Sequence, residues 1–196
     1  MKKKIAITGG IGSGKSTVLR EISKMGYPVF SCDEIYKEIM LSQAYVEKIR
    51  EKFPQCIKDG TIDRKILSEI VFQNEKARKV LNDIAHPLIM HTLFQRMNSS
   101  SSNLVFAEVP LLFEGNYEVL FDNVIVVLRD TNDRVKALIE RDHTSEEKIK
   151  NRINTQFDYF SEQAKLRYKN CNAYILNNKG DIKDLTKEIS KIIPSL

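Results

Sequence analysis

Short runs of consecutive apolar residues recur along the chain, separated by longer segments with helical spacing of apolar positions. Continuous apolar strands, unlike alternating ones, are typical of parallel sheets that helices cover on both faces. Five such runs predict strands: Ile5–Thr8, Pro28–Ser31, Leu104–Ala107, Asn123–Leu128 and Ala173–Leu176. Helices between these strands predict a layered α/β fold.

Two of the predicted helices lie near the two ends of the chain. Residues 15–25 place Val18, Leu19 and Ile22 on one face, and Gly26 is a typical helix stop. A second helix is expected over residues 181–193, at the C-terminal end of the chain.

The second and third predicted strands are separated by far more residues than a crossover connection needs. Within this gap, Ile66–Val71 and Val80–Ala85 have helical spacing of apolar positions. We therefore expect residues 33–97 to form a helical insertion beside the sheet. The serine-rich residues 98–103 then form a polar loop that returns the chain to the sheet.

The composition is that of a globular protein. The chain has 196 residues, of which 42% are hydrophobic and 29% charged, and this suits one domain over residues 1–196. A net charge of +5 fits an anionic ligand, but the charge alone favours a solvated surface as its explanation. No basic, aromatic-rich motif indicates nucleic acid.

The cysteines and apolar segments bear on location. Cys32, Cys56 and Cys171 are widely spaced and form no C-x-x-C pair, so we expect neither a disulfide framework nor a zinc site. No run approaches the roughly 20 apolar residues of a membrane span, and the apolar run after the N-terminal lysines is too short for a signal peptide. We expect a cytoplasmic protein that does not bind a membrane.

A glycine-rich segment follows the first predicted strand. The sequence GGIGSGKST, residues 9–17, fits G-x-x-x-x-G-K-[ST], with a strand before it and a helix after it. Glycines let backbone N–H groups converge on phosphate oxygens, and the N-terminus of the helix favours the same anion. The segment predicts a nucleoside triphosphate site with Mg²⁺.

Each residue of this segment has an expected role. We expect the N–H groups around Gly12, Ser13 and Gly14 to surround the phosphates, and Lys15 to reach the β- and γ-phosphates. The Ser16 hydroxyl is the expected Mg²⁺ ligand, and the Thr17 hydroxyl can bind the α-phosphate.

Two other classes of protein share this loop. Residues 178–181 match the N-K-x-D of GTPases, but D-x-x-G occurs nowhere and Asp181 can simply cap the last helix. A motor ATPase usually has an aspartate at the end of an apolar strand, whereas the third predicted strand ends in a single glutamate, Glu108.

A small-molecule kinase needs a second substrate site, a base and additional cations. The insertion supplies room for a substrate, and Asp33 follows the second strand, on the same edge as the glycine-rich loop. A cation-rich segment follows the fourth strand. Its members are Arg129, Arg134, Arg141, Lys148, Lys150 and Arg152, of which we expect Arg141 and Arg152 to be functional and most of the others, such as Lys150 with Glu146, to be solvated.

Six segments together resemble the dephospho-coenzyme A kinase family, in order and in spacing. They are TGGIGSGKST at 8–17, DEI at 33–35, GTIDRKILSEIVF at 60–72 with LNDIAHPLI at 81–89, VPLLFE at 109–114, ERDHTSEEKIKNRINTQ at 140–156, and NNKG at 177–180.

The resemblance implies transfer of the γ-phosphoryl group of ATP to the 3′-hydroxyl of dephospho-CoA, giving CoA and ADP. It implies a three-layer P-loop kinase fold with a five-stranded parallel sheet, whose core is residues 1–32, 98–139 and 157–196. The insertion would bind CoA, and residues 140–156 would form a lid. We expect a monomer or weak homo-oligomer. A nucleoside or nucleotide kinase, or a nucleotide-binding switch, remains the alternative.

The resemblance also assigns residues. Asp33 would be the general base, Arg141 a lid arginine on the phosphates, and Asn178 part of the turn near the adenine. The substrate side would include Arg64, His86, Pro110 and Leu111. For these last positions other roles are open, since His86 precedes Pro87 and can shape a helix junction, and residues 110–113 can be core or pocket wall.

The chain departs from the family pattern at two places. The family often has Asp-Ala-Asp where this chain has Ser31, Cys32 and Asp33, so only the last carboxylate is present. A second lid arginine often stands four residues before Arg141, where this chain has Ala137. Arg134, one turn earlier, is a candidate to compensate.

Overall fold

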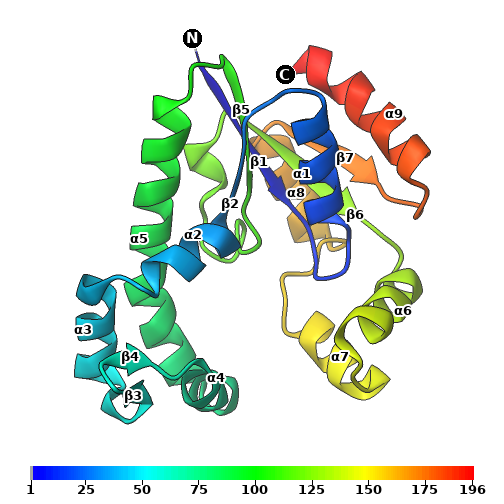
Figure 1. The fold of residues 1–196 in the computed structure, drawn as a ribbon. Helices are drawn as coiled ribbons and strands as arrows, with labels where there is room; N and C mark the ends of the chain where they lie inside the picture. The colour runs from blue at the N-terminus through cyan, green and yellow to red at the C-terminus, as the bar shows by residue number, and fades with distance from the viewer. Residues whose placement is uncertain (1) are drawn as a thin grey trace. The chain divides into compact units, whose positions relative to one another are not determined.

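The computed structural model describes residues 2–196. They divide into two compact units. One contains the chain up to Phe30 together with Ser100–Leu196, and the other is Ser31–Ser99. The first unit contains the central sheet and the glycine-rich loop (Figure 1).

The five predicted strands are confirmed, and they form one parallel sheet. Its strands are β1 (Lys3–Thr8), β2 (Val29–Ser31), β5 (Leu104–Glu108), β6 (Asn123–Leu128) and β7 (Ala173–Asn177), in the order β2-β5-β1-β6-β7. Strand β1 is central and pairs in parallel with β5 and β6, with Ile7 opposite both Glu108 and Ile125. This register places the ends of β1 and β5 at the same edge.

Helices of the first unit follow the sheet strands along the chain. They are α1 (Lys15–Lys24), α6 (Thr131–Asp142), α7 (Glu146–Asn154), α8 (Glu162–Asn170) and α9 (Ile182–Ile192), with short 3-10 turns η2 (Glu118–Leu120) and η3 (Ile193–Ser195). The Asp181 side chain caps α9 by accepting hydrogen bonds from the backbone N–H groups of Lys183 and Asp184. The aspartate of the N-K-x-D match at residues 178–181 is therefore explained by its role as a helix cap.

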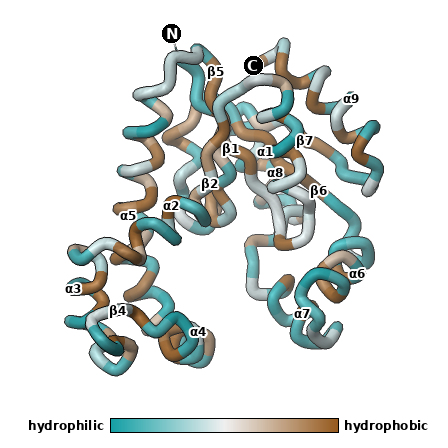
Figure 2. Tube along the Cα trace, viewed as in Figure 1, coloured by the Kyte–Doolittle hydropathy of each residue, from teal (hydrophilic) through white to brown (hydrophobic). Residues whose placement is uncertain are grey.

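The core of this unit lies between one face of the sheet and the helices α1 and α9, which lie side by side (Figure 1). Ile5 and Ile7 of β1 are fully buried there against Val18 and Ile22 of α1. The strands are mostly hydrophobic in Figure 2, whereas α6 and α7 are largely hydrophilic. Burial of the apolar face of α1 fixes the helix that begins at the glycine-rich loop.

The second unit is mainly helical. Its elements are α2 (Cys32–Ile39), α3 (Gln43–Lys52), η1 (Pro54–Cys56), β3 (Ile57–Lys58), β4 (Thr61–Ile62), α4 (Arg64–Gln73) and α5 (Glu75–Ser99). Tyr45 and Ile49 of α3 are almost fully buried in a separate core with Leu67 of α4 and Ala85 of α5. This core gives the unit its own hydrophobic centre.

The structure adds one element in this region and corrects two expectations. The sequence reading missed the β3–β4 hairpin, whose turn is the dipeptide Asp59–Gly60 with both φ angles positive, at 47° and 75°. A helix junction at His86 is wrong, because α5 runs through Pro87 without interruption. The polar loop begins at Ser100 rather than at residue 98, since α5 extends to Ser99.

The continuity of α5 has a physical explanation. Pro87 is exposed, so water can solvate the carbonyl group that loses its helical partner. On the opposite side, Ala85, Met90 and Leu93 are buried, and their packing maintains one helix through the proline.

Within residues 2–196, no helix combines the length and apolarity needed to cross a membrane.

Candidate phosphate-binding site

The glycine-rich loop connects β1 to α1 and is built for an anion. Gly14 occupies the N-cap position of α1 with a φ of 101°, and Gly12 also has a positive φ, at 77°. Residues other than glycine are strained at these positive φ angles. A Cβ on Gly14 would also lie 2.3 Å from Asn178 Nδ2, so both backbone strain and close packing require glycine there.

Lys15 is folded onto the loop. Its side chain is buried, and Nζ donates hydrogen bonds to the carbonyl oxygens of Gly9 at 2.9 Å and Gly10 at 3.2 Å. These contacts hold the ammonium group at the mouth of the loop, next to the N-terminus of α1. Two positive features thus coincide, as a triphosphate site requires.

Ser13 adds a polar atom without a protein partner. Its hydroxyl oxygen is buried and makes no hydrogen bond within the described chain. A buried hydroxyl without a partner is unfavourable, and a phosphate oxygen in the loop could accept its hydrogen.

Ser16 and Glu108 form a pair at the edge of the sheet. Ser16 is exposed in the first turn of α1, and its hydroxyl donates a hydrogen bond to Glu108 Oε1 at 3.2 Å. Glu108 is the last residue of β5 and is buried. A hydroxyl and a carboxylate at a phosphate loop match the oxygen ligands that Mg²⁺ prefers, because Mg²⁺ keeps several waters and takes few protein ligands. The local sequence around Glu108 does not indicate a role in binding Mg²⁺.

Asn178 links the turn after β7 to the glycine-rich loop. It is buried, its Nδ2 donates to the Ser13 carbonyl at 2.8 Å, and its Oδ1 accepts from the Gly180 N–H at 2.9 Å. Both ends of the amide are therefore used within the protein. The structure places this predicted nucleotide-binding residue as a support of the loop.

The segment after α7 contacts the loop from another direction. Gln156 Oε1 accepts a hydrogen bond from the Ile11 N–H at 2.8 Å, and the hydroxyl groups of Tyr159 and Thr8 are 3.1 Å apart. Arg134 of α6 donates from Nε to the Ile11 carbonyl at 2.8 Å. Sequence reasoning missed Gln156 and Tyr159, because nothing in their local pattern indicates which distant backbone they contact.

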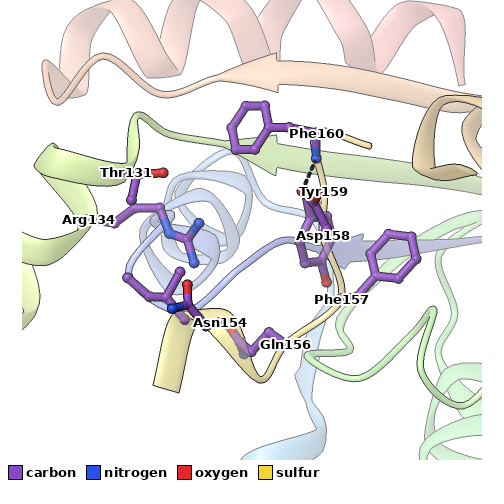
Figure 3. Close-up of a pocket in the computed structure, with 9 residues that line it drawn as sticks. Thr131, Arg134, Asn154, Gln156, Phe157, Asp158, Tyr159 and Phe160 are labelled. Atoms are coloured by element: carbon purple, nitrogen blue, oxygen red, sulfur yellow. Dashed lines mark hydrogen bonds between the residues drawn. The ribbon is translucent and has the colours of Figure 1, made fainter. Parts of the chain in front are cut away.

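These side chains surround a hollow of about 400 Å³ (Figure 3). It is lined by Thr131, Arg134, Ile153, Asn154, Gln156, Phe157, Asp158, Tyr159 and Phe160. Figure 3 shows the guanidinium group of Arg134 pointing into this space. The wall is well anchored, because the rings of Phe157 and Tyr159 pack against Phe113.

The predicted lid arginine lies at the end of α6. Arg141 is exposed, and its Nε forms an ion pair with Asp142 Oδ1 at 2.6 Å, while Arg152 of α7 reaches Asp142 Oδ2 at 2.7 Å. The hydrogen bond from Arg141, followed by that from Arg152, lowers the pKa of Asp142 to about 2. The structure pairs Arg141 with Asp142 rather than with a group of the loop.

The remaining predicted residues lie outside the loop. Pro110 and Leu111 follow β5 in the first unit, where Leu111 is partly exposed. Asp33, Arg64 and His86 belong to the second unit. His86 is half-buried on α5, and burial lowers the pKa of its imidazole, whereas Arg64 is exposed at the start of α4.

An aspartate between a strand and a helix can also serve as the N-cap of the helix, but Asp33 does not occupy that position. The N-cap of α2 is Ser31, which makes no side-chain capping hydrogen bond, and Asp33 is an exposed residue of the first helical turn. An N-cap role for Asp33 is therefore wrong. A carboxylate in this turn still interacts favourably with the helix dipole.

A family model and a known relative each match nearly the whole chain. The sequence model of the dephospho-CoA kinase family matches residues 3–184. The dephospho-CoA kinase of Fusobacterium nucleatum is 33% identical over 194 residues, which cover 98% of this chain and 97% of the relative.

Two solved structures are similar in both sequence and fold. The crystal structure of TT1252 from Thermus thermophilus has a TM-score of 0.83 and 29% identity, covering 100% of this chain and 98% of the other. The dephospho-CoA kinase from Campylobacter jejuni has a TM-score of 0.63 and 27% identity, covering 99% and 97%.

Proposed function

The chain belongs to the dephospho-CoA kinase family, and from that premise we propose that it transfers the γ-phosphoryl group of ATP to the ribose 3′-hydroxyl of dephospho-CoA. The products are CoA and ADP, and the reaction is the final step of coenzyme A biosynthesis. The observation that carries the proposal is a phosphate loop, with its buried lysine, inside a family match that spans residues 3–184.

On the donor side, the loop binds the triphosphate. The N–H groups around Gly12, Ser13 and Gly14 surround the phosphates, and the Thr17 hydroxyl binds the α-phosphate. Lys15 exchanges its bonds to the Gly9 and Gly10 carbonyls for bonds to the β- and γ-phosphates. Its charge then stabilises the negative charge that builds on these oxygens during transfer.

Magnesium completes the donor side. Ser16 would bind the ion directly, and Glu108 would hold its water ligands, since the two side chains are already hydrogen-bonded to each other. The bound ion supplies positive charge to the phosphate oxygens. Asn178 supports the loop through Ser13, so the N–H groups keep their direction when the nucleotide enters.

On the acceptor side, Asp33 accepts the proton of the 3′-hydroxyl as the general base. It is exposed, as a group that meets a substrate from solution must be. Arg64, His86, Pro110 and Leu111 are the further residues that we assign to the dephospho-CoA site. Arg141 would leave Asp142 and contact the phosphates when residues 140–156 close over ATP.

The test is an assay of ADP release with a panel of acceptors. Purified protein with ATP and Mg²⁺ is given dephospho-CoA, AMP, CMP or no acceptor. We expect release with dephospho-CoA to exceed release without an acceptor by orders of magnitude. The Lys15→Ala variant serves as the inactive control, and Lys24→Ala, at the exposed end of the same helix, as the active control.

Each outcome of this assay is informative. Equal turnover with and without an acceptor would exclude a kinase and favour a nucleotide-binding switch. A preference for AMP or CMP would indicate a nucleotide kinase with the same fold.

A further inference from the structure

Arg134 is a buried cation next to the phosphate loop. It lies on α6, only 6% of its surface is exposed, and its Nε donates to the Ile11 carbonyl at 2.8 Å. A Cβ on Gly10 would lie 2.4 Å from Arg134 Nη2, so the guanidinium group packs directly on the backbone of the loop. Burial removes part of the hydration of this charge and lowers the pKa of Arg134.

No carboxylate among the described residues balances this charge. In the part of the chain that the structure describes, Arg134 forms no ion pair with any aspartate or glutamate, unlike Arg141, Arg152 or Arg167. Among residues 2–196, Nε alone has a hydrogen-bond acceptor, and the other N–H groups of the guanidinium donate to none. A buried charge without a partner is unfavourable, so the absence of a protein anion points to an anion from outside.

A second cation lies close by. Lys15 Nζ binds the carbonyl of Gly10, and the guanidinium of Arg134 packs on the same residue. Two buried like charges at one glycine repel each other and weaken the ligand-free state. A polyanion in the loop would relieve this repulsion and gain attraction from both groups.

The position of Arg134 is fixed by its surroundings. Ile11 is bound from both sides, since its N–H donates to Gln156 and its carbonyl accepts from Arg134. Its side chain packs against the cluster formed by Val135 and Leu138 of α6 and Ile149 of α7. The guanidinium therefore cannot turn away from the loop without breaking these contacts, and its free N–H groups face the hollow in Figure 3.

We propose that Arg134 is a second phosphate-binding cation of this site, and that the triphosphate is the counter-ion that its buried guanidinium lacks among the described residues. Gln156 is its positioning residue, because it holds the Ile11 peptide to which Arg134 is bound. The inference rests on the proposed function only in requiring that a triphosphate occupies the loop.

The alternative is that Arg134 only ties α6 to the loop. The two explanations differ in the ligand-free protein. Removing a structural tie lowers the melting temperature, whereas removing an unbalanced buried charge leaves it unchanged or raises it. The two explanations also differ in how binding depends on the charge of the ligand. A purely structural contact between α6 and the loop would not favour an anionic ligand over a neutral one.

The test compares Arg134→Gln, Arg134→Lys and Lys136→Gln. Gln removes the charge but keeps an N–H donor for Ile11, Lys keeps the charge, and Lys136 is an exposed cation on the same helix. Binding of ATP and of inorganic triphosphate is measured by calorimetry, and the melting temperature is measured without ligand. Inorganic triphosphate reports on the phosphate site alone.

We expect Arg134→Gln to weaken both ligands by about tenfold or more, as the loss of a charged hydrogen bond does, without lowering the melting temperature. Arg134→Lys should retain most of the affinity, and Lys136→Gln all of it. The inference is overturned if Arg134→Gln binds both ligands as the unsubstituted protein does, or if the Gln and Lys variants lose melting temperature and affinity equally.

The result is separable from the proposed function. If the protein binds triphosphate through Arg134 but does not phosphorylate dephospho-CoA, the function fails and the inference stands. If it phosphorylates dephospho-CoA and Arg134→Gln binds both ligands normally, the inference fails and the function stands.

Discussion

The side-chain amide of Asn178 donates a hydrogen bond to the backbone carbonyl of Ser13 at 2.8 Å, although 165 residues separate them in the chain. Asn178 is itself fixed, because its N–H donates to the Leu128 carbonyl at 2.8 Å and its Oδ1 accepts from Gly180. The turn after the last strand of the sheet therefore holds the phosphate loop in shape before any nucleotide arrives.

Replacing Asn178 by alanine should loosen the loop. The change leaves the buried Ser13 carbonyl without its partner, and such losses cost about 1–3 kcal/mol of unfolding free energy. We expect weaker ATP binding together with this loss, measured by calorimetry and urea unfolding. Asn177→Ala, at the exposed neighbouring position, is the control for stability. Unchanged stability and affinity in Asn178→Ala would mean that the contact does not support the loop.

Glu108→Gln should raise the requirement for Mg²⁺. Glutamine can still accept the hydrogen bond from Ser16, but it lacks the charge that favours the ion and its waters. Loss of such an outer ligand commonly weakens metal binding by about tenfold or more. The measurement is the Mg²⁺ concentration at half-maximal activity, and we expect the rate to recover at high Mg²⁺. The same Mg²⁺ dependence as the unsubstituted protein would remove Glu108 from the metal site.

Arg141→Ala should lower kcat sharply and leave stability nearly unchanged. The ion pair with Asp142 is exposed, and such pairs contribute about 0–1 kcal/mol. Loss of a charge that stabilises the transferring phosphoryl group costs about a hundredfold in rate. Steady-state kinetics and thermal unfolding distinguish the two effects. Lys150→Ala, which removes an exposed cation paired with Glu146 on α7, should keep full activity. A normal kcat in Arg141→Ala would exclude it from the reaction.

Asp33→Asn tests the assigned general base. Asp33 and Glu34 are both exposed acids in the first turn of α2, so Glu34→Gln removes the same charge from the same helix end. Either change should cost well under about 1 kcal/mol through the helix dipole. Only Asp33→Asn should reduce kcat by about a hundredfold or more, with near-normal KM values, because Asn cannot accept the proton. Equal activities of the two variants would contradict the assignment.

Much of the fold could be predicted because it depends on local patterns. The apolar runs of Ile5–Thr8 and Asn123–Leu128 predict buried parallel strands without knowledge of their neighbours. The β3–β4 hairpin was missed because strands of two residues give no pattern beyond the Asp59–Gly60 turn. The sequence leaves a helix junction open at His86 and Pro87 because the rule against proline in helices is local, whereas packing along the opposite side of α5 decides the outcome.

The site could be predicted only where its chemistry lies in one segment. The glycine-rich loop and Lys15 are contiguous, so their spacing alone indicates a phosphate site. The contacts that fix the loop join Ile11 to Arg134 and Gln156, which lie 123 and 145 residues away. Such contacts depend on how α6 and the segment after α7 pack against the loop within the first unit. No local sequence pattern encodes this packing.

The most direct test of the central claim identifies the product made from ATP and dephospho-CoA. The protein is incubated with both substrates and Mg²⁺, and the product is analysed by mass spectrometry and phosphorus NMR. The account predicts one added phosphoryl group, present as a monoester on the ribose 3′-oxygen, and one ADP for each product molecule. Inorganic phosphate released without a phosphorylated acceptor, or a phosphoryl group on any other oxygen of dephospho-CoA, would contradict it.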